Sequence, residues 1–152
     1  MLLLSFKIGH DDYVIDTTDV VEIIPLVSLK EIPGCDTAVA GLLNYHGASV
    51  PVIDLNTLCG QNSQVKTLTT RIILVRYEGK VLGLITSSVS ETLRLEEDDF
   101  KSTGINSGEN KFLGDIAQYE NRFVQRVNID QLLTDSLRNA LFSEHSTGSE
   151  AN

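Results

Sequence analysis

Alternating apolar and polar residues recur along this chain in short runs, which is the pattern of half-buried β-strands. The first run puts Leu4, Phe6 and Ile8 on one face. Gly, Pro or Asp residues end most runs. The pattern predicts ten strands, over 2–8, 13–16, 20–24, 41–45, 49–53, 71–77, 81–86, 89–94, 112–119 and 122–127. Short strands closed by turns at this spacing favour small barrels over a parallel sheet with crossover helices.

The stretch 41–55 carries the clearest local signals. Two apolar runs flank His46-Gly47, and such a Gly-containing turn predicts a β-hairpin. Pro51 cannot donate a ladder hydrogen bond, so we expect its strand to be an edge strand or to carry a bulge. Asp54 is the predicted N-cap of a short helix that Gly60 ends.

The strand pattern repeats within the chain. Residues 4–26 align with residues 73–95 without a gap, so apolar strand positions recur in step. A Val-x-Glu element and the hairpin turn recur as well: Val20-x-Glu22 with Val89-x-Glu91, and Tyr45-His46-Gly47 with Tyr119-Glu120-Asn121. Asn121 tolerates the left-handed conformation that such turns use, as Gly does. We interpret the pattern as an internal duplication, with halves of roughly 1–60 and 70–142 in a single domain over 1–142.

The C-terminal region has helical periodicity. Asn128 is the predicted N-cap of a helix, and Gln131 completes a pattern similar to a capping box. One apolar stripe is expected to dock on a barrel, and it comprises Ile129, Leu132, Leu133, Leu137, Ala140 and Leu141. Residues 143–152 are polar and are predicted to be a disordered tail.

Composition and charge narrow the classes of function. The chain has 152 residues and a formal net charge of -9, so it shows no basic face for nucleic acid. No apolar run approaches membrane-spanning length and no signal peptide is evident, which predicts a cytoplasmic protein without direct membrane insertion. Cys35 and Cys59 are the only cysteines, and we expect both to be reduced and partly buried.

Catalytic and metal-binding patterns are weak. His10, His46 and His145 fall in two turns and the tail, a spacing that does not indicate a metal site. Cys35 and His46 are the one conceivable nucleophile and base, but nothing in the sequence places them together. We therefore predict a protein that is not an enzyme and has no catalytic, cofactor-binding or metal-binding residues. An enzyme that uses Cys35 or an unrecognised carboxylate pair is the alternative.

Several short motifs follow one another in a fixed order over about residues 3–142. They are Phe6-x-Ile8-Gly9, Tyr13-x-Ile15, Val20-x-Glu22-Ile23, Ile32-Pro33, Gly41-x-x-Asn44-x-x-Gly47, Val50-Pro51-Val52-Ile53-Asp54-Leu55, Arg71-Ile72-Ile73-Leu74-Val75 and Gly83-Leu84-Ile85. Together they resemble the CheW-like domain of bacterial chemotaxis adaptors. The resemblance implies a mainly β fold of two intertwined five-stranded SH3-like β-barrels with short helices and a C-terminal helix.

The resemblance also implies a role and partners. Proteins of this family are non-enzymatic scaffolds that couple the cytoplasmic tips of methyl-accepting chemoreceptors to a CheA-type histidine kinase. Receptor contact in the family lies mainly in the groove between the barrels, and kinase contact lies on barrel faces. The residues that the resemblance points to as protein-binding are Val20, Glu22, Ile23, Gly41, Asn44, His46, Gly47 and Val89.

Two positions depart from the family pattern. The family has N-x-R-G where this chain has Asn44-Tyr45-His46-Gly47, and it usually has Val-Asp where Thr86-Ser87 stands here. Arginine offers a permanent charge and a planar fork of donors, whereas a neutral histidine offers neither. An adaptor of an alternative chemosensory pathway, or a module for another signalling enzyme, therefore remains a second interpretation.

Overall fold

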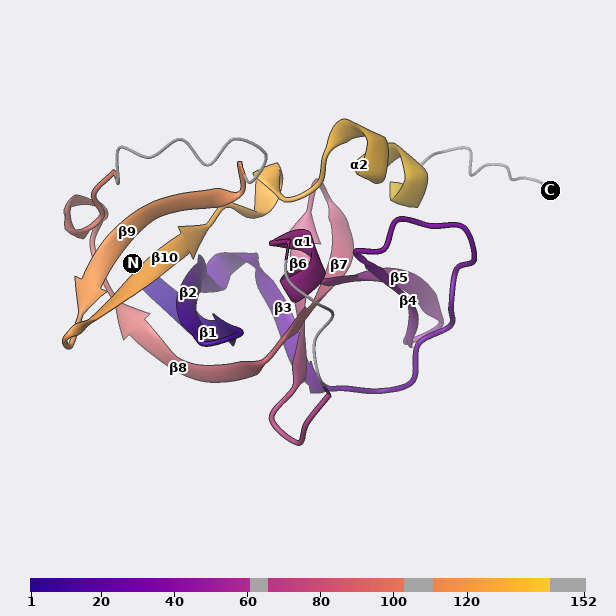
Figure 1. Ribbon diagram of the computed structural model, residues 1–152, viewed down its shortest axis with the longest axis horizontal. Coiled ribbons are helices and arrows are strands. Elements are labelled where there is room, and N and C mark those ends of the chain that lie inside the picture. The colour runs from indigo at the N-terminus through magenta and orange to yellow at the C-terminus, as the bar shows by residue number, and fades with distance from the viewer. Residues whose placement is uncertain (61–65, 103–110, 143–152) are drawn as a thin grey trace.

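The computed structural model describes residues 1–60, 66–102 and 111–142, so the predicted tail at 143–152 lies outside the described residues. The fold is mainly β (Figure 1). The strands are β1 (Leu2–Ile8), β2 (Asp11–Asp16), β3 (Val20–Pro25), β4 (Val39–Tyr45), β5 (Ala48–Asp54), β6 (Arg71–Tyr77), β7 (Lys80–Thr86), β8 (Ser88–Arg94), β9 (Leu113–Tyr119) and β10 (Arg122–Val127). The helices are α1 (Leu55–Leu58) and α2 (Asp135–Phe142), with 3-10 turns at Thr17–Asp19, Glu97–Asp99 and Ile129–Gln131. Each predicted strand is present, with ends that differ by at most a few residues.

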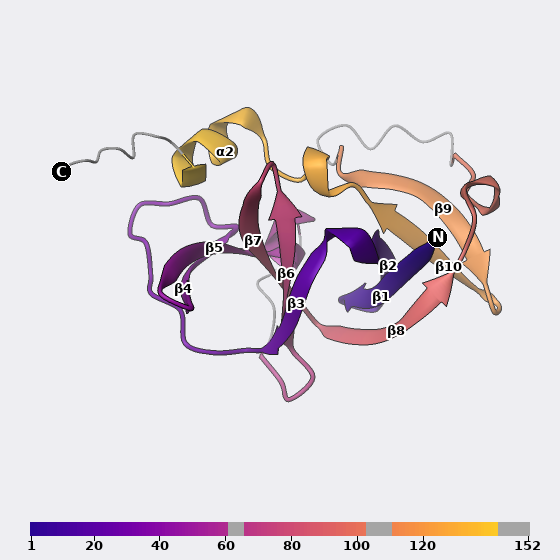
Figure 2. The same cartoon turned by 180° about the vertical axis from the view of Figure 1, so that it is seen from behind.

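The strands form two five-stranded sheets that share both halves of the chain. Sheet A has the order β8-β1-β2-β10-β9, and sheet B has the order β3-β6-β7-β5-β4. The chain crosses from sheet A to sheet B after β2 and returns after β7, so the two halves exchange strands (Figure 2). Neighbouring strands are antiparallel except at β2–β10 and β5–β7, where strands from different halves pair in parallel. The intertwined two-barrel architecture is therefore confirmed.

Two hairpin turns at equivalent places in the two halves share one backbone geometry. His46 and Gly47 have φ of 52° and 85°, and Glu120 and Asn121 have φ of 49° and 68°. Two consecutive residues with positive φ form the tight hairpin turn whose twist matches that of the flanking strands. The turn predicted at His46-Gly47 is confirmed, and its counterpart in the second half has the same form.

The repeated Val-x-Glu element is a β-bulge in both halves. In β3, Val20 faces Val75 and Glu22 faces Leu74, so Val21 is an extra residue in the ladder. A similar register shift occurs in the β1–β8 pairing, next to Val89. A bulge bends and twists its strand. Each bulge lies near the start of a strand that follows a crossing between the sheets.

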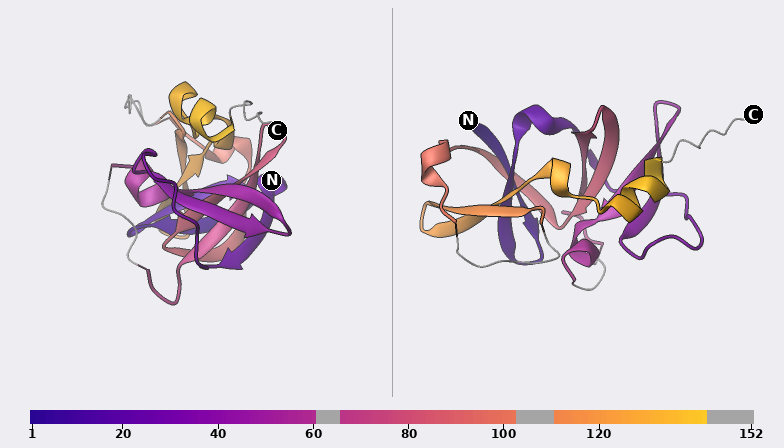
Figure 3. Two further views of the ribbon diagram at one scale, coloured as in Figure 1. Left: turned by 90° about the vertical axis from the view of Figure 1, so that its right-hand side faces the viewer. Right: turned by 90° about the horizontal axis from the view of Figure 1, so that it is seen from above.

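Among the described residues, three apolar clusters make up the core. The central cluster lies between the sheets, and six of its residues were predicted to be buried: Leu4, Phe6, Ile15, Ile73, Val75 and Leu84. None of these six exposes more than 5% of its surface, which confirms the prediction. The other two clusters fill the inside of sheet A, around Leu3 and Val14, and the inside of sheet B, around Val52 and Leu74. Figure 3 shows the two sheets side by side along the long axis of the molecule.

The prediction for Pro51 is wrong. β5 lies between β7 and β4, so it is not an edge strand, and the register shift beside it falls in β4, between Val39 and Gly41. Proline is tolerated inside the sheet because β5 pairs with β7 only from Val52 onward. The missing N–H of Pro51 therefore interrupts no hydrogen bond of that parallel ladder.

The short helix after β5 forms as predicted. The Asp54 carboxylate accepts a hydrogen bond from the Asn56 backbone N–H at 2.9 Å, which is an N-cap contact. Cys59 follows the last helical residue, and Gly60 adopts the left-handed φ of 83° that ends the helix.

The C-terminal helix differs from the prediction. Asn128 makes no side-chain cap, and a 3-10 turn at Ile129–Gln131 precedes α2 instead of one continuous helix. Thr134 starts α2, because its hydroxyl accepts a hydrogen bond from the Leu137 N–H at 3.1 Å. The apolar stripe does pack on the central cluster through Ile129, Leu132, Leu133 and Leu137, with Leu141 at its margin. Ala140 is exposed, contrary to the prediction.

Candidate functional site

Four of the predicted protein-binding residues meet where the two outer strands of sheet B approach each other. Glu22 lies on β3, Asn44 ends β4 with Tyr45, and His46 and Gly47 form the turn. The Tyr45 hydroxyl donates a hydrogen bond to the Glu22 carboxylate at 2.5 Å. We call this surface, made of Glu22, Asn44, Tyr45, His46 and Gly47, the β3–β4 seam.

Contacts within the seam fix its shape. The rings of Tyr45 and His46 pack with centroids 4.4 Å apart. The Asn44 side-chain oxygen accepts a hydrogen bond from the Gly47 N–H at 3.1 Å, which holds the turn. The hydrogen bond to the Glu22 carboxylate raises the pKa of Tyr45 above its ordinary value. The seam therefore presents a carboxylate, a phenol and an imidazole on rigid strands.

Sequence reasoning did not single out Tyr45 as a functional residue. The sequence did contain a signal for Tyr45, because Tyr45 and Glu22 recur as Tyr119 and Glu91 in the second half. The contact between them depends on how sheet B curls, which brings its two outer strands together. A pattern of strands alone does not give that curvature.

Val20, Ile23 and Val89 lie on a different face. Residues paired across neighbouring strands point to the same side of a sheet. Val20 pairs with Val75, Ile23 with Ile73, and Val89 with Phe6, and these three partners belong to the central cluster. Val20 and Val89 are partly buried against that cluster, whereas Ile23 keeps 39% of its surface exposed. Of these three, Ile23 offers the most surface to a partner.

Gly41 is buried, and its role in the structure is to let another segment of the backbone approach β4 closely. Its φ is 147°, and a Cβ placed on it would lie 2.6 Å from the Lys30 carbonyl oxygen. Lys30 and Leu42 exchange two backbone hydrogen bonds of 2.9 and 2.8 Å beside it. The close approach of the Lys30 segment to β4 requires glycine here.

We expect Gly41→Ala to lower the free energy of unfolding by about 2–4 kcal/mol, because the methyl group both strains the backbone and strikes the Lys30 carbonyl. Gly60→Ala is the matched control, because Gly60 has φ of 83° with no atom near its added Cβ. The control should cost about 1–2 kcal/mol from backbone strain alone. Urea unfolding of both variants measures the difference, and equal losses would contradict the steric account.

Thr86-Ser87, the second departure from the pattern that the resemblance predicts, lies largely inside the protein. Thr86 is fully buried, and the Ser87 hydroxyl accepts a hydrogen bond from the Gly9 N–H at 3.0 Å. The Ser87 backbone N–H also donates to the Lys7 carbonyl. Thr86-Ser87 therefore ties β7 and β8 to the β1–β2 turn. This leaves His46 as the exposed departure of the two.

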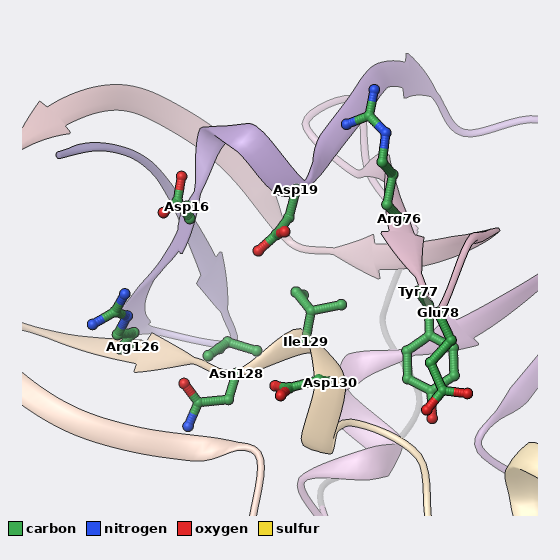
Figure 4. A pocket seen from close by; sticks show the side chains of 10 residues that line it. Asp16, Asp19, Arg76, Tyr77, Glu78, Arg126, Asn128, Ile129 and Asp130 are labelled. Carbon is green, nitrogen blue, oxygen red and sulfur yellow. The ribbon is translucent and has the colours of Figure 1, made fainter.

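A charged groove of about 510 Å³ lies between the two sheets (Figure 4). Its charged lining residues are Asp16, Asp19, Arg76, Glu78, Arg126 and Asp130. Arg76 donates to the Thr18 carbonyl at 2.9 Å, and Arg126 forms an ion pair with Glu97 at 2.9 Å. Burial raises the pKa of Asp19, which points into the groove. Because most of its lining side chains are charged, the groove favours polar contacts over apolar ones.

Sheet A carries an exposed aromatic side chain that the sequence prediction missed. Phe123 exposes 69% of its surface beside an open cleft of about 690 Å³. Ile116, Gln118 and Lys101 line the same cleft. The sequence signal is the position of Phe123, which lies one residue before the buried Val124 on an alternating strand.

Metal-ligating side chains and cysteines are the groups of the described part of the chain that bear on catalysis. No group of three or more His, Cys, Asp or Glu residues able to hold a metal ion occurs there. Both cysteines are free thiols, and burial raises the pKa of Cys59 to about 11, which disfavours the nucleophilic thiolate. No helix among the described residues is long and apolar enough to span a membrane.

Comparison with known proteins settles the family. The model of the CheW-like domain matches residues 2–137. The chain belongs to the CheW-like family. Among curated relatives, the chemotaxis protein CheW of Rhizobium meliloti is 24% identical over 140 residues, covering 91% of this chain and 90% of its own. CheW of Bacillus subtilis is 24% identical over 133 residues, covering 86% of this chain and 85% of its own.

A solved structure agrees with the sequence comparison. The scaffolding protein TtCheW of Thermoanaerobacter tengcongensis superposes with a TM-score of 0.82 and 26% identity, over 90% of this chain and 94% of that one. This chain is thus a CheW-like chemotaxis scaffold protein with the two-barrel architecture. Within it, the β3–β4 seam contains His46, the position at which the resemblance predicts an arginine.

Proposed function

We propose that this CheW-like scaffold couples the cytoplasmic tip of a chemoreceptor to a CheA-type histidine kinase, and that it does so by binding alone, without catalysis or a cofactor. The observation that carries the proposal is the likeness to a scaffolding protein along almost the whole chain. The cytoplasm is the compartment we propose, because the receptor tip and the kinase meet there. The net charge of -9 fits protein partners better than nucleic acid.

The β3–β4 seam is the surface that we assign to partner binding. Turns held by rigid strands commonly carry contacts. Here the Tyr45–Glu22 hydrogen bond and the Asn44–Gly47 hydrogen bond hold the turn that presents His46. Little reorganisation is then needed when a partner binds, which favours affinity.

A second candidate function is a binding module for another signalling enzyme or an alternative chemosensory pathway. The observation that favours it is His46, which is exposed and stands where the family has arginine. A partner that recognises a permanent guanidinium charge at that turn loses the contact. The identity of the kinase that binds separates the two candidates.

We expect His46→Ala to weaken partner binding and to change the free energy of unfolding by no more than about 0.5 kcal/mol, because the side chain is exposed. Calorimetric titration against the receptor tip and the kinase regulatory domain measures the effect. Unchanged affinity for both partners would remove this turn from the binding surface.

His46→Arg is the companion variant. It restores the charge that the family carries, so binding to a CheA-type kinase of the flagellar pathway should strengthen. If His46→Arg instead weakens binding to the native kinase, the histidine is an adaptation to that partner, and the second candidate function is favoured.

A further inference from the structure

The internal repeat allows the β3–β4 seam to be compared with its counterpart within the same molecule. In sheet A, Glu91 on β8 and Tyr119 on β9 occupy the places of Glu22 and Tyr45. Arg122 lies between them, with its guanidinium 3.1 Å from the Glu91 carboxylate and 5.7 Å from the centre of the Tyr119 ring. The carboxylate at this seam therefore has a cation supplied by the chain itself, which it shares with Asp12 at 3.3 Å from the same guanidinium.

The seam of sheet B has the carboxylate and the phenol but not the cation. Ala48 stands at the repeat position of Arg122, directly after the turn. Glu22 contacts the neutral Tyr45 hydroxyl, and it forms no ion pair within residues 1–60, 66–102 and 111–142. The two seams thus differ in charge at two repeat positions: Arg122 stands in place of Ala48, and the carboxylate of Glu120 stands in place of His46.

We propose that Glu22 is the docking point for an arginine or lysine side chain of the protein that binds at the β3–β4 seam, a proposal that rests on the proposed adaptor function. The partner supplies in trans the cation that Arg122 supplies in cis at the other seam. The Tyr45 hydroxyl holds one carboxylate oxygen, and the other oxygen is open to a second donor. A carboxylate held in this way suits the planar fork of a guanidinium.

Neighbouring features fit a long cationic side chain. β3 is an outer strand of sheet B, and Glu22 is exposed at its rim. Ile23, the next residue, exposes 39% of its surface on the other face of β3 and adds apolar surface near the same rim. The net charge of -9 adds a general attraction for a basic surface.

The test replaces one charge and keeps the shape. Glu22→Gln retains an oxygen that accepts from Tyr45 but removes the negative charge. Glu91→Gln is the matched control, because that carboxylate already has its cation in Arg122. Both variants and the wild type are titrated calorimetrically against the purified receptor tip and the purified kinase regulatory domain, at about 20 mM and about 500 mM salt. Urea unfolding first confirms that both variants fold.

At low salt, Glu22→Gln should weaken binding to one of the two partners about five- to tenfold, and the loss should shrink at high salt because exposed charge pairs are screened. Glu91→Gln should stay within about twofold of the wild type. If wild type and Glu22→Gln bind both partners equally at low salt, the docking point is overturned while the adaptor function stands. If the wild type binds neither partner, both proposals are overturned.

A scan of the affected partner identifies the cation. Each exposed arginine and lysine of its binding region is replaced with glutamine, and each variant is titrated against wild type and Glu22→Gln. One partner substitution should weaken binding to the wild type but not weaken it further in Glu22→Gln, which is the signature of a direct pair. Strictly additive losses throughout the scan would contradict a cation at Glu22.

Discussion

Replacing Phe6 with alanine is expected to lower the free energy of unfolding by about 3–5 kcal/mol. Phe6 is fully buried in the central cluster, and its ring packs with the Tyr13 ring at a centroid distance of 6.1 Å. The cluster contains residues of both sheets, so a cavity there weakens the joint between the two barrels as well as one strand. Chemical denaturation of the purified variant measures the loss.

Leu68→Ala is the control for the Phe6 experiment. Leu68 is 96% exposed, and its truncation should change the free energy of unfolding by no more than about 0.5 kcal/mol. A loss below about 1 kcal/mol for Phe6→Ala would show that the two sheets do not share a tightly packed core.

A chain that ends at Asn128 is expected not to fold. This truncation removes four apolar side chains from the central cluster, namely Ile129, Leu132, Leu133 and Leu137. Losing each buried aliphatic side chain costs about 2–5 kcal/mol, so the four losses together are comparable with the whole of the roughly 5–15 kcal/mol that holds a typical domain folded. Circular dichroism during heating should show no cooperative transition.

The control for this truncation is a chain that ends at Phe142. It keeps α2 and the four apolar side chains of the central cluster, so its melting temperature should match that of the full chain. A cooperative transition in the chain that ends at Asn128 would mean that the C-terminal segment is dispensable to the core.

The strands were predictable because their apolar runs are short and end at turns. Alternation was only part of the signal: Leu3 and Leu4 are neighbours in sequence and both buried, yet they belong to different clusters. Where both faces of a strand are buried in this way, the sequence reads as a continuous apolar run. The hairpin at His46-Gly47 was predictable because few residues adopt consecutive positive φ values.

Features that depend on long-range geometry were predicted less well. Pro51 was expected at an edge because a local rule does not reveal where the parallel β5–β7 ladder begins. The predicted cap at Asn128 failed because Thr134, six residues later, caps α2 instead. Both corrections concern residues whose local preference was read correctly but whose neighbours in space were unknown.

In the candidate site, too, the contacts between residues close in sequence were predictable, whereas the contacts between distant strands were not. Asn44 and Gly47 are adjacent in sequence to His46, so their meeting in one turn was predictable. Glu22 joins them only because the outer strands of sheet B approach each other, and this brought in Tyr45 as an unpredicted member. Gly41 was grouped with these residues by motif, yet the approach of Lys30 gives it a structural reason to be glycine. A role for any of them in partner binding remains a prediction.

The internal duplication also remains a prediction, and the structure adds support to it. Both hairpin turns have the same geometry, and both Val-x-Glu elements coincide with bulges. The pair Glu22–Tyr45 also has its counterpart in Glu91 and Tyr119, where Glu120 and Arg122 replace His46 and Ala48.

The most direct test of the adaptor account is kinase control in a reconstituted assembly. Membranes that contain the receptor encoded in the same genome are mixed with the matching CheA-type kinase, with and without this protein, and phosphate transfer from ATP to the kinase is measured. The account predicts that kinase activity rises and becomes sensitive to the receptor's ligand only when the protein is present. Kinase activity that is unchanged by the protein, in an assay where an established CheW adaptor raises it, would contradict the account.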